Sequence, residues 1–112
     1  MKQSLEEYLT EIGRKEMLTQ EEELALANAI QEKGPDCKEV ERLVQANLRF
    51  VVAVANQYQG RGLTIEELIE VGNEGLRKAA ETYVPDADSK FIVYAVKRIR
   101  QSIIQAIEEN KQ

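Results

Sequence analysis

The sequence predicts an all-α fold, a compact helical bundle of about five helices, and three observations support this. Apolar residues recur every three or four positions in five segments, which is the spacing of an amphipathic helix. The pattern Ser/Thr-x-x-Glu opens three of these segments, at Ser4, Thr19 and Thr64, and it is typical of a capped helix start. No alternating stretch is long enough to predict a strand. The connections are short, as in a helical bundle.

In chain order, helices are expected over residues 4–13, 19–33, 36–58, 65–81 and 89–107. Gly13 is expected to end the first helix, and the pair Gly34-Pro35 the second. Asp36, followed three residues later by Glu39, offers a cap for the third helix. The last helix is expected to begin near Ser89 and to run past its final apolar residues.

The length of 112 residues and the hydrophobic content of 43% predict one globular domain. Within it, residues 1–34 are expected to pack as an upstream segment on a core formed by residues 36–112. No apolar run approaches the roughly 18 residues of a membrane span, and no signal peptide is evident. Cys37 is the single cysteine and histidine is absent, so neither a disulfide nor a zinc site is expected. We therefore expect a cytoplasmic protein.

The charge distribution is uneven. The net charge of −5 argues against a domain that binds nucleic acid by bulk electrostatics. Residues 89–107, however, contain four cations and no acid. These cations are Lys90, Lys97, Arg98 and Arg100. A local basic stripe is therefore expected on an otherwise acidic chain.

The helix over residues 65–81 has two unusual features. Gly72 and Gly75 lie inside it, although each glycine costs about 1 kcal/mol relative to alanine. Close approach of a neighbouring helix would explain both glycines. On the other side, polar residues repeat at helical spacing, namely Glu67, Glu70, Asn73, Glu74 and Arg77. Such a polar ridge is either solvated surface or a docking face for a partner.

The last helix combines aromatic and basic residues. Phe91 and Tyr94 lie within a turn of Lys90, Lys97 and Arg98, a combination that suits phosphate contacts and base stacking. The alternatives are that the aromatic residues belong to the core and that the cations only balance the helix dipole. No histidine base, activated nucleophile or phosphate-binding loop is present. We therefore expect a recognition domain and not an enzyme.

Two consecutive stretches carry a resemblance to a known family. Residues 45–63 read QANLRFVVAVANQYQGRGL and residues 65–81 read IEELIEVGNEGLRKAAE. They resemble the second conserved region of bacterial RNA polymerase sigma factors of the primary type. The match continues at Tyr8-Leu9, Leu18-Thr19, Lys90-Phe91, Tyr94-Ala95 and Ile99-Arg100-Gln101. It covers nearly the whole chain without an insertion.

The resemblance implies two partners, core RNA polymerase and promoter DNA, and it implies no cofactor and no membrane. The helix over residues 65–81 is expected to dock on the clamp coiled coil of the largest polymerase subunit. The residues expected to dock are Glu67, Leu68, Glu70, Asn73 and Arg77. Within the holoenzyme, the last helix is expected to bind the minus-ten promoter element and its non-template strand. The residues expected to contact DNA are Asn47, Arg49, Lys90, Phe91, Tyr94, Lys97, Arg98, Arg100 and Gln101.

The sequence also departs from the family. Asp86-Ala87-Asp88 stands where a basic pair and a glycine are usual, and Lys97-Arg98 stands where two tryptophans are usual. Ser89 replaces an aromatic residue, Ile104 a hydroxyl residue and Val71 an acid. Loss of the aromatic residues removes stacking contacts, each worth about 1–3 kcal/mol. The departures predict weak binding of minus-ten DNA by the free chain.

Three readings therefore remain open at this point. The leading one is a sigma-factor domain that binds core polymerase and contributes to minus-ten recognition. The second is a degenerate sigma-like regulator that occupies the clamp without melting promoter DNA. The third, a helical adaptor unrelated to transcription, requires the resemblance to be discarded. The chain ends at Gln112 without a helix-turn-helix domain, so a fragment or a reduced protein is expected.

Overall fold

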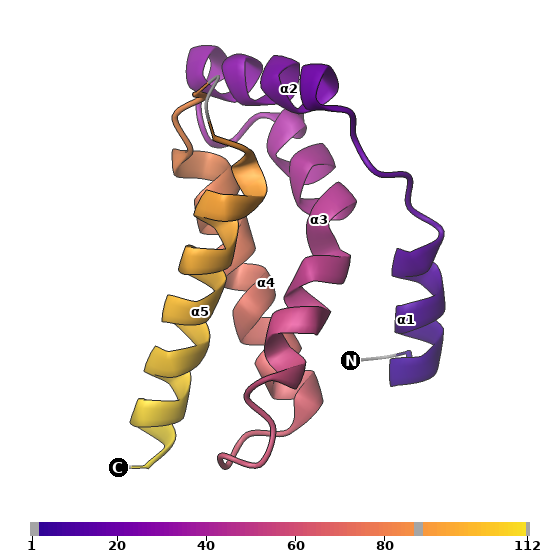
Figure 1. Cartoon of the computed structure of the whole chain (residues 1–112), viewed down its shortest axis with the longest axis vertical. Helices are drawn as coiled ribbons and strands as arrows, with labels where there is room; N and C mark the ends of the chain where they lie inside the picture. The colour runs from indigo at the N-terminus through magenta and orange to yellow at the C-terminus, as the bar shows by residue number, and fades with distance from the viewer. Residues whose placement is uncertain (1–2, 87–88, 112) are drawn as a thin grey trace.

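The computed structural model describes residues 3–86 and 89–111 and contains five helices in that part of the chain (Figure 1). They are α1 (Leu5–Gly13), α2 (Gln20–Lys33), α3 (Lys38–Asn56), α4 (Ile65–Thr82) and α5 (Phe91–Asn110). The predicted all-α bundle of about five helices is confirmed. In the described ranges no helix has both the length and the apolar character needed to cross a membrane.

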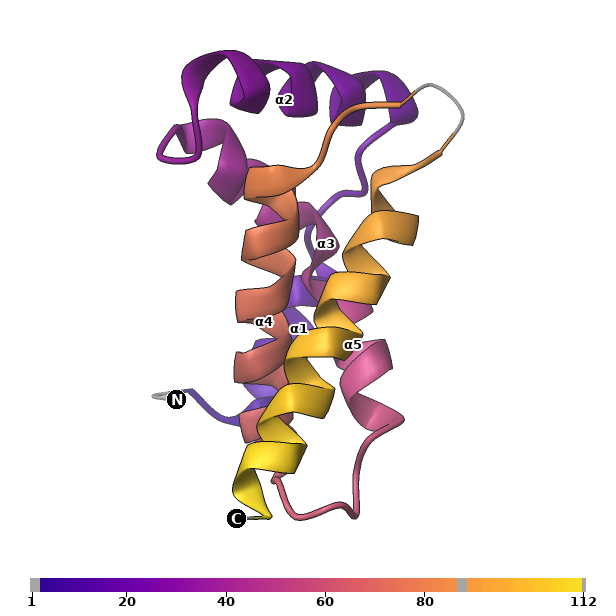
Figure 2. The same cartoon turned by 90° about the vertical axis from the view of Figure 1, so that its left-hand side faces the viewer.

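Three long helices form the centre of the molecule. α3, α4 and α5 run alongside one another, and the most extensive packing joins α4 to α5 and α3 to α4 (Figures 1 and 2). α2 lies across one end of this group, and α1 lies beside α3 (Figure 1). The largest fully buried side chains come from α3, α4 and α5, namely Phe91, Leu43, Leu68, Ile69, Leu76, Ile99, Ile103, Val40 and Val51. α1 buries Ile12 and is the helix most weakly attached to this core.

The starts of the helices follow the capping signals with one exception. Thr19 and Thr64 form complete capping boxes, and Ser4 accepts a hydrogen bond from the backbone of Glu7 at 3.1 Å. The expectation that Asp36 caps α3 is wrong. Cys37 occupies the N-cap position without a side-chain cap hydrogen bond, and Glu39 pairs with Lys33 at 2.7 Å instead.

Two predicted helix ends also differ from the structure. α3 ends at Asn56, two residues before the predicted end, because Gln57 and Tyr58 donate to carbonyls three residues back and tighten the last turn. α1 includes Gly13 and closes at Arg14. Gly34, by contrast, adopts φ of 96° at the end of α2, which explains the glycine there.

The two glycines of α4 lie where neighbouring helices come closest. A Cβ atom on Gly75 would stand 2.9 Å from the backbone oxygen of Arg98 and 3.1 Å from the Cα of Ile99, both in α5. A Cβ atom on Gly72 would stand 2.6 Å from a methyl group of Val51 in α3. The close-approach interpretation of both glycines is confirmed. The absence of side chains at these positions sets the spacing between α4 and its neighbours.

Candidate functional site

The acidic ridge of α4 lies on the side of the helix away from the glycines. It consists of Glu67, Glu70 and Glu74, all exposed. Glu67 also accepts the backbone N–H of Thr64 at 2.9 Å and so completes the capping box. The predicted docking residues Glu67 and Glu70 therefore share one exposed face with Glu74.

The remaining predicted docking residues are engaged within the domain. Arg77 donates a hydrogen bond to Glu41 of α3 and forms an ion pair with it. This bond, and to a lesser extent a hydrogen bond from Gln45, holds the pKa of Glu41 below its usual value. Asn73 donates through Nδ2 to the Tyr8 hydroxyl of α1 at 3.2 Å. Its Oδ1 is buried and has no hydrogen-bond partner among the described residues. Tyr8 thus fixes the orientation of the Asn73 amide.

Leu68 does not belong to the exposed ridge. Its side chain is fully buried among the core residues of α3, α4 and α5. Its position one residue after Glu67 turns it by about 100° around the helix, toward the interior. A direct contact of Leu68 with a partner stays a prediction, and its side chain lies beneath the exposed ridge in the core.

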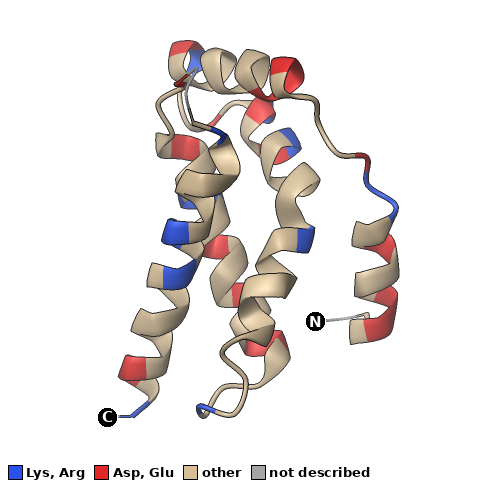
Figure 3. Cartoon of the chain, in the orientation of Figure 1, with Lys and Arg blue, Asp and Glu red and all other residues tan. Residues whose placement is uncertain are grey.

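The cations of the basic stripe lie at the start and in the middle of α5 (Figure 3). Lys97, Arg100 and Gln101 are exposed there, and Arg98 is half-buried. Arg100 reaches toward Gln57, with 3.5 Å between Nη2 and Oε1. The stripe lies between two exposed aliphatic side chains, Val93 at 54% and Ile104 at 45%. Lys90, at the start of the same helix, is exposed as well.

The aromatic residues of α5 form no exposed stacking platform. Phe91 is fully buried, with its ring edge-on to Tyr83 at 5.2 Å between centroids. The core holds the ring of Phe91, and a contact of Phe91 with DNA stays a prediction that has this burial against it. Tyr94 is half-buried, lies 5.6 Å from the ring of Tyr83, and shares a hydrogen bond of 2.7 Å with Thr82.

Two predicted DNA residues lie in α3 and are engaged by the domain itself. Asn47 is 5% exposed and donates to the carbonyl of Leu43 at 2.8 Å. Arg49 donates to the carbonyl of Lys15, in the connector of residues 14–19 between α1 and α2. Both residues fix local structure. Of the acidic stretch before α5, Ala87 and Asp88 lie outside the described residues.

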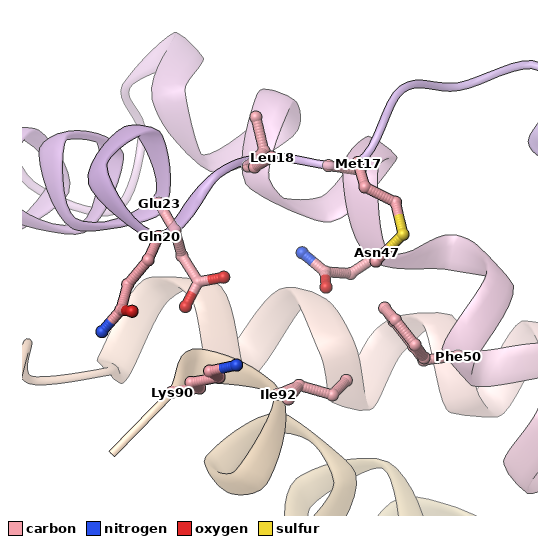
Figure 4. A pocket seen from close by; sticks show the side chains of 9 residues that line it. Met17, Leu18, Gln20, Glu23, Asn47, Phe50, Lys90 and Ile92 are labelled. Carbon is pink, nitrogen blue, oxygen red and sulfur yellow. The ribbon is translucent and has the colours of Figure 1, made fainter. Parts of the chain in front are cut away.

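A cavity of about 180 Å³ lies between the connector, the start of α2, α3 and the start of α5 (Figure 4). Its apolar walls include Met17, Phe50 and Ile92, and its polar groups include Asn47, Glu23 and Lys90. Figure 4 shows Lys90 and Glu23 at one end and Phe50 and Asn47 at the other. Two predicted site residues, Asn47 and Lys90, line this cavity together although they lie 43 positions apart in the sequence.

Most residues that line this cavity were not predicted as site residues. Met17, Leu18, Gln20 and Glu23 belong to the upstream segment, which the sequence indicated only as helical packing. Met17 is 60% exposed. The sequence contained one signal for this cavity, the apolar pair Met17-Leu18 directly before the Thr19 cap. Such a pair lies outside any helix, so its apolar side chains are not explained by the packing face of a helix.

The acidic ridge on α4, the basic stripe on α5 and the cavity that Lys90 lines are the candidate interaction surfaces of this all-α domain. The family described as Sigma-70 region 2 matches residues 43–112, and that described as Sigma-70 factor, region 1.2, matches residues 4–35. The chain belongs to the sigma-70 family, and the resemblance seen in the sequence is confirmed.

The chain is also similar to two curated relatives. These are the RNA polymerase sigma factor SigA of Listeria monocytogenes and that of Listeria innocua. Each is 46% identical to the chain over 102 residues, which cover 91% of this chain and 27% of the relative. The chain thus spans about a quarter of the length of these relatives.

Proposed function

We propose that this domain binds core RNA polymerase through the acidic ridge of α4 and contacts minus-ten promoter DNA along α5 as part of a cytoplasmic transcription-initiation complex. The observation that carries the DNA contact is the cavity at the start of α5, which Lys90 of the basic stripe lines. Family membership supports both contacts. The clamp coiled coil of the largest subunit is the proposed docking partner.

The ridge suits a partner that carries cations. Glu70 and Glu74 are exposed, and neither is used in a helix cap or an ion pair within the described chain. Charges that are free at the surface steer association and fix the orientation of a complex. The core beneath them, which includes Leu68, holds α4 rigidly in place.

Reversal of two ridge charges is expected to disrupt docking. The double variant Glu70→Lys and Glu74→Lys should weaken binding to core polymerase by at least about tenfold, because like charges would then face each other. The matched control is Glu21→Lys with Glu32→Lys, two exposed acids on α2. The measurement is the affinity of fluorescently labelled domain for core polymerase. An equal loss in both double variants would indicate a net-charge effect and contradict the ridge.

The proposed DNA face combines phosphate attraction with the cavity that Lys90 lines. Lys97 and Arg100 suit the backbone of a single strand, and the cavity beside Lys90 suits one unstacked base. Apolar walls with a few polar groups are what a flipped base requires. Because the whole chain is acidic, we expect DNA affinity to be measurable mainly when core polymerase is bound.

Truncation of one cavity wall is expected to weaken DNA binding. In complex with core polymerase, Met17→Ala should lower the affinity for a labelled non-template minus-ten oligonucleotide about fivefold, as one apolar contact of about 1 kcal/mol is removed. Stability should change little, since Met17 is 60% exposed. Leu9→Ala, on the exposed side of α1, is the control. Unchanged affinity for Met17→Ala would remove the cavity from the proposed DNA path.

A second function has its own supporting observation, the lack of an exposed aromatic residue on the described part of α5. Phe91 is buried, Tyr94 is tied to Thr82, and cations stand at positions 97 and 98. A domain that docks on polymerase without melting DNA would act as a regulator of other sigma factors. Permanganate reactivity of a promoter with core polymerase and this domain distinguishes the two functions. Reactive thymines within the minus-ten element would exclude the regulator.

A further inference from the structure

α5 begins without a cap of its own. Its N-cap residue, Lys90, makes no side-chain cap hydrogen bond, and its first turn contains no acid. α2 and α4, by contrast, each begin with a complete capping box. The first backbone N–H groups of a helix have no partner within the helix. At the start of α5, as at that of α3, these groups are left to water or to an acceptor from elsewhere in the fold.

That acceptor comes from α2. The backbone N–H of Phe91 donates to Oε1 of Glu23 at 2.8 Å, across 68 positions of sequence and in a partly buried setting. Figure 4 shows the Glu23 carboxylate extending from α2 toward the start of α5. A carboxylate at this position also interacts favourably with the positive end of the helix dipole. Glu22, the neighbouring residue, is committed to the Thr19 capping box.

We propose that Glu23 is the positioning residue of α5. By capping α5 from α2, Glu23 fixes the first turn of that helix and so the positions of Lys90 and Ile92. Glu23, Lys90 and Ile92 all line the cavity, so the same cap also sets the width of the cavity. The upstream segment thereby places the DNA-contacting helix as well as packing on it. The effect on DNA rests on the function proposed above, whereas the effect on α5 does not.

The test compares Glu23→Ala, Glu23→Gln and the control Glu21→Ala in the full chain. Glu21 is exposed in the same first turn of α2, so both alanine variants remove one acid from that turn. Amide hydrogen exchange at Phe91 should be on the order of tenfold faster in Glu23→Ala, the size expected for loss of a helix cap. Glu23→Gln keeps an acceptor oxygen and should restore most of the protection. Exchange in Glu21→Ala should match the parent chain.

Binding of the non-template oligonucleotide in complex with core polymerase is the second measurement. It should fall several-fold in Glu23→Ala and recover in Glu23→Gln. Unchanged exchange at Phe91 in Glu23→Ala, or equal acceleration in Glu21→Ala, would overturn the proposal. Faster exchange with unchanged oligonucleotide binding would support the cap and contradict the proposed DNA face.

Discussion

Replacement of Phe91 by alanine is expected to lower the free energy of unfolding by about 3–5 kcal/mol, the range for truncation of a buried phenylalanine. The ring is fully buried and packs edge-on against Tyr83. Such a loss is a large part of the roughly 5–15 kcal/mol that a domain of ordinary stability has. Urea denaturation followed by circular dichroism measures it.

The comparison with Ile104→Ala separates a core role of Phe91 from a surface role. Ile104 lies on the same helix and is 45% exposed, so its truncation should change stability by less than about 1 kcal/mol. If Phe91 were a surface contact for DNA, its truncation would resemble that of Ile104 in stability and would act on DNA affinity alone. Equal unfolding midpoints for the two variants would therefore contradict the buried position of Phe91.

Replacement of Gly75 by alanine is expected to lower the free energy of unfolding by up to about 2 kcal/mol. Overpacking of about 1–3 kcal/mol outweighs a gain of about 1 kcal/mol in helix propensity. The new Cβ would meet Ser102 Oγ at 2.7 Å and the backbone oxygen of Arg98 at 2.9 Å. A side chain can rotate away, but a backbone carbonyl can yield only if α5 shifts.

Two further variants test this reasoning. Adding Ser102→Ala to Gly75→Ala removes the nearest atom and should restore only part of the stability, since the Arg98 carbonyl remains. Gly72→Ala should be milder, because its nearest neighbour is a methyl group of Val51 at 2.6 Å, which belongs to a side chain. Thermal unfolding of the four chains gives the comparison. Full recovery of stability in the Gly75 and Ser102 double variant would show that the Ser102 side chain, and not the backbone of α5, limits the space at Gly75.

Helix positions could be predicted from the sequence because capping and periodicity are local. Thr19 and Thr64 each reach only three residues along the chain, so the sequence contains the whole interaction. The prediction of a cap at Asp36 failed because it used local sequence alone. Asp36 and Glu39 have the spacing of a capping box, but Glu39 pairs with Lys33 of α2 instead. Local signals therefore identify a helix and do not show which competing contact prevails.

The candidate site could be predicted only in part. Exposed polar residues such as Glu70 and Lys97 lie where the helical pattern placed them. Leu68 and Phe91 are buried, as the apolar face of each helix predicts. Only the family resemblance assigned them contacts with partners, because motif membership gives a residue's neighbours in sequence and not its burial. The contact between Glu23 and Phe91 spans 68 positions and follows only from the way α2 crosses the end of the bundle. The cavity depends on the same crossing and could not be predicted.

At Gly75 the backbones of α4 and α5 lie almost in contact, and this packing separates the acidic ridge from the basic stripe. The acidic ridge and the basic stripe belong to adjacent helices, and the layer between them is set by glycine, Ser102 and Ile99. A surface substitution on either helix leaves that layer untouched, so each face can acquire new specificity without a compensating change in the other. A change on the proposed polymerase-binding face is therefore compatible with an unchanged proposed DNA face.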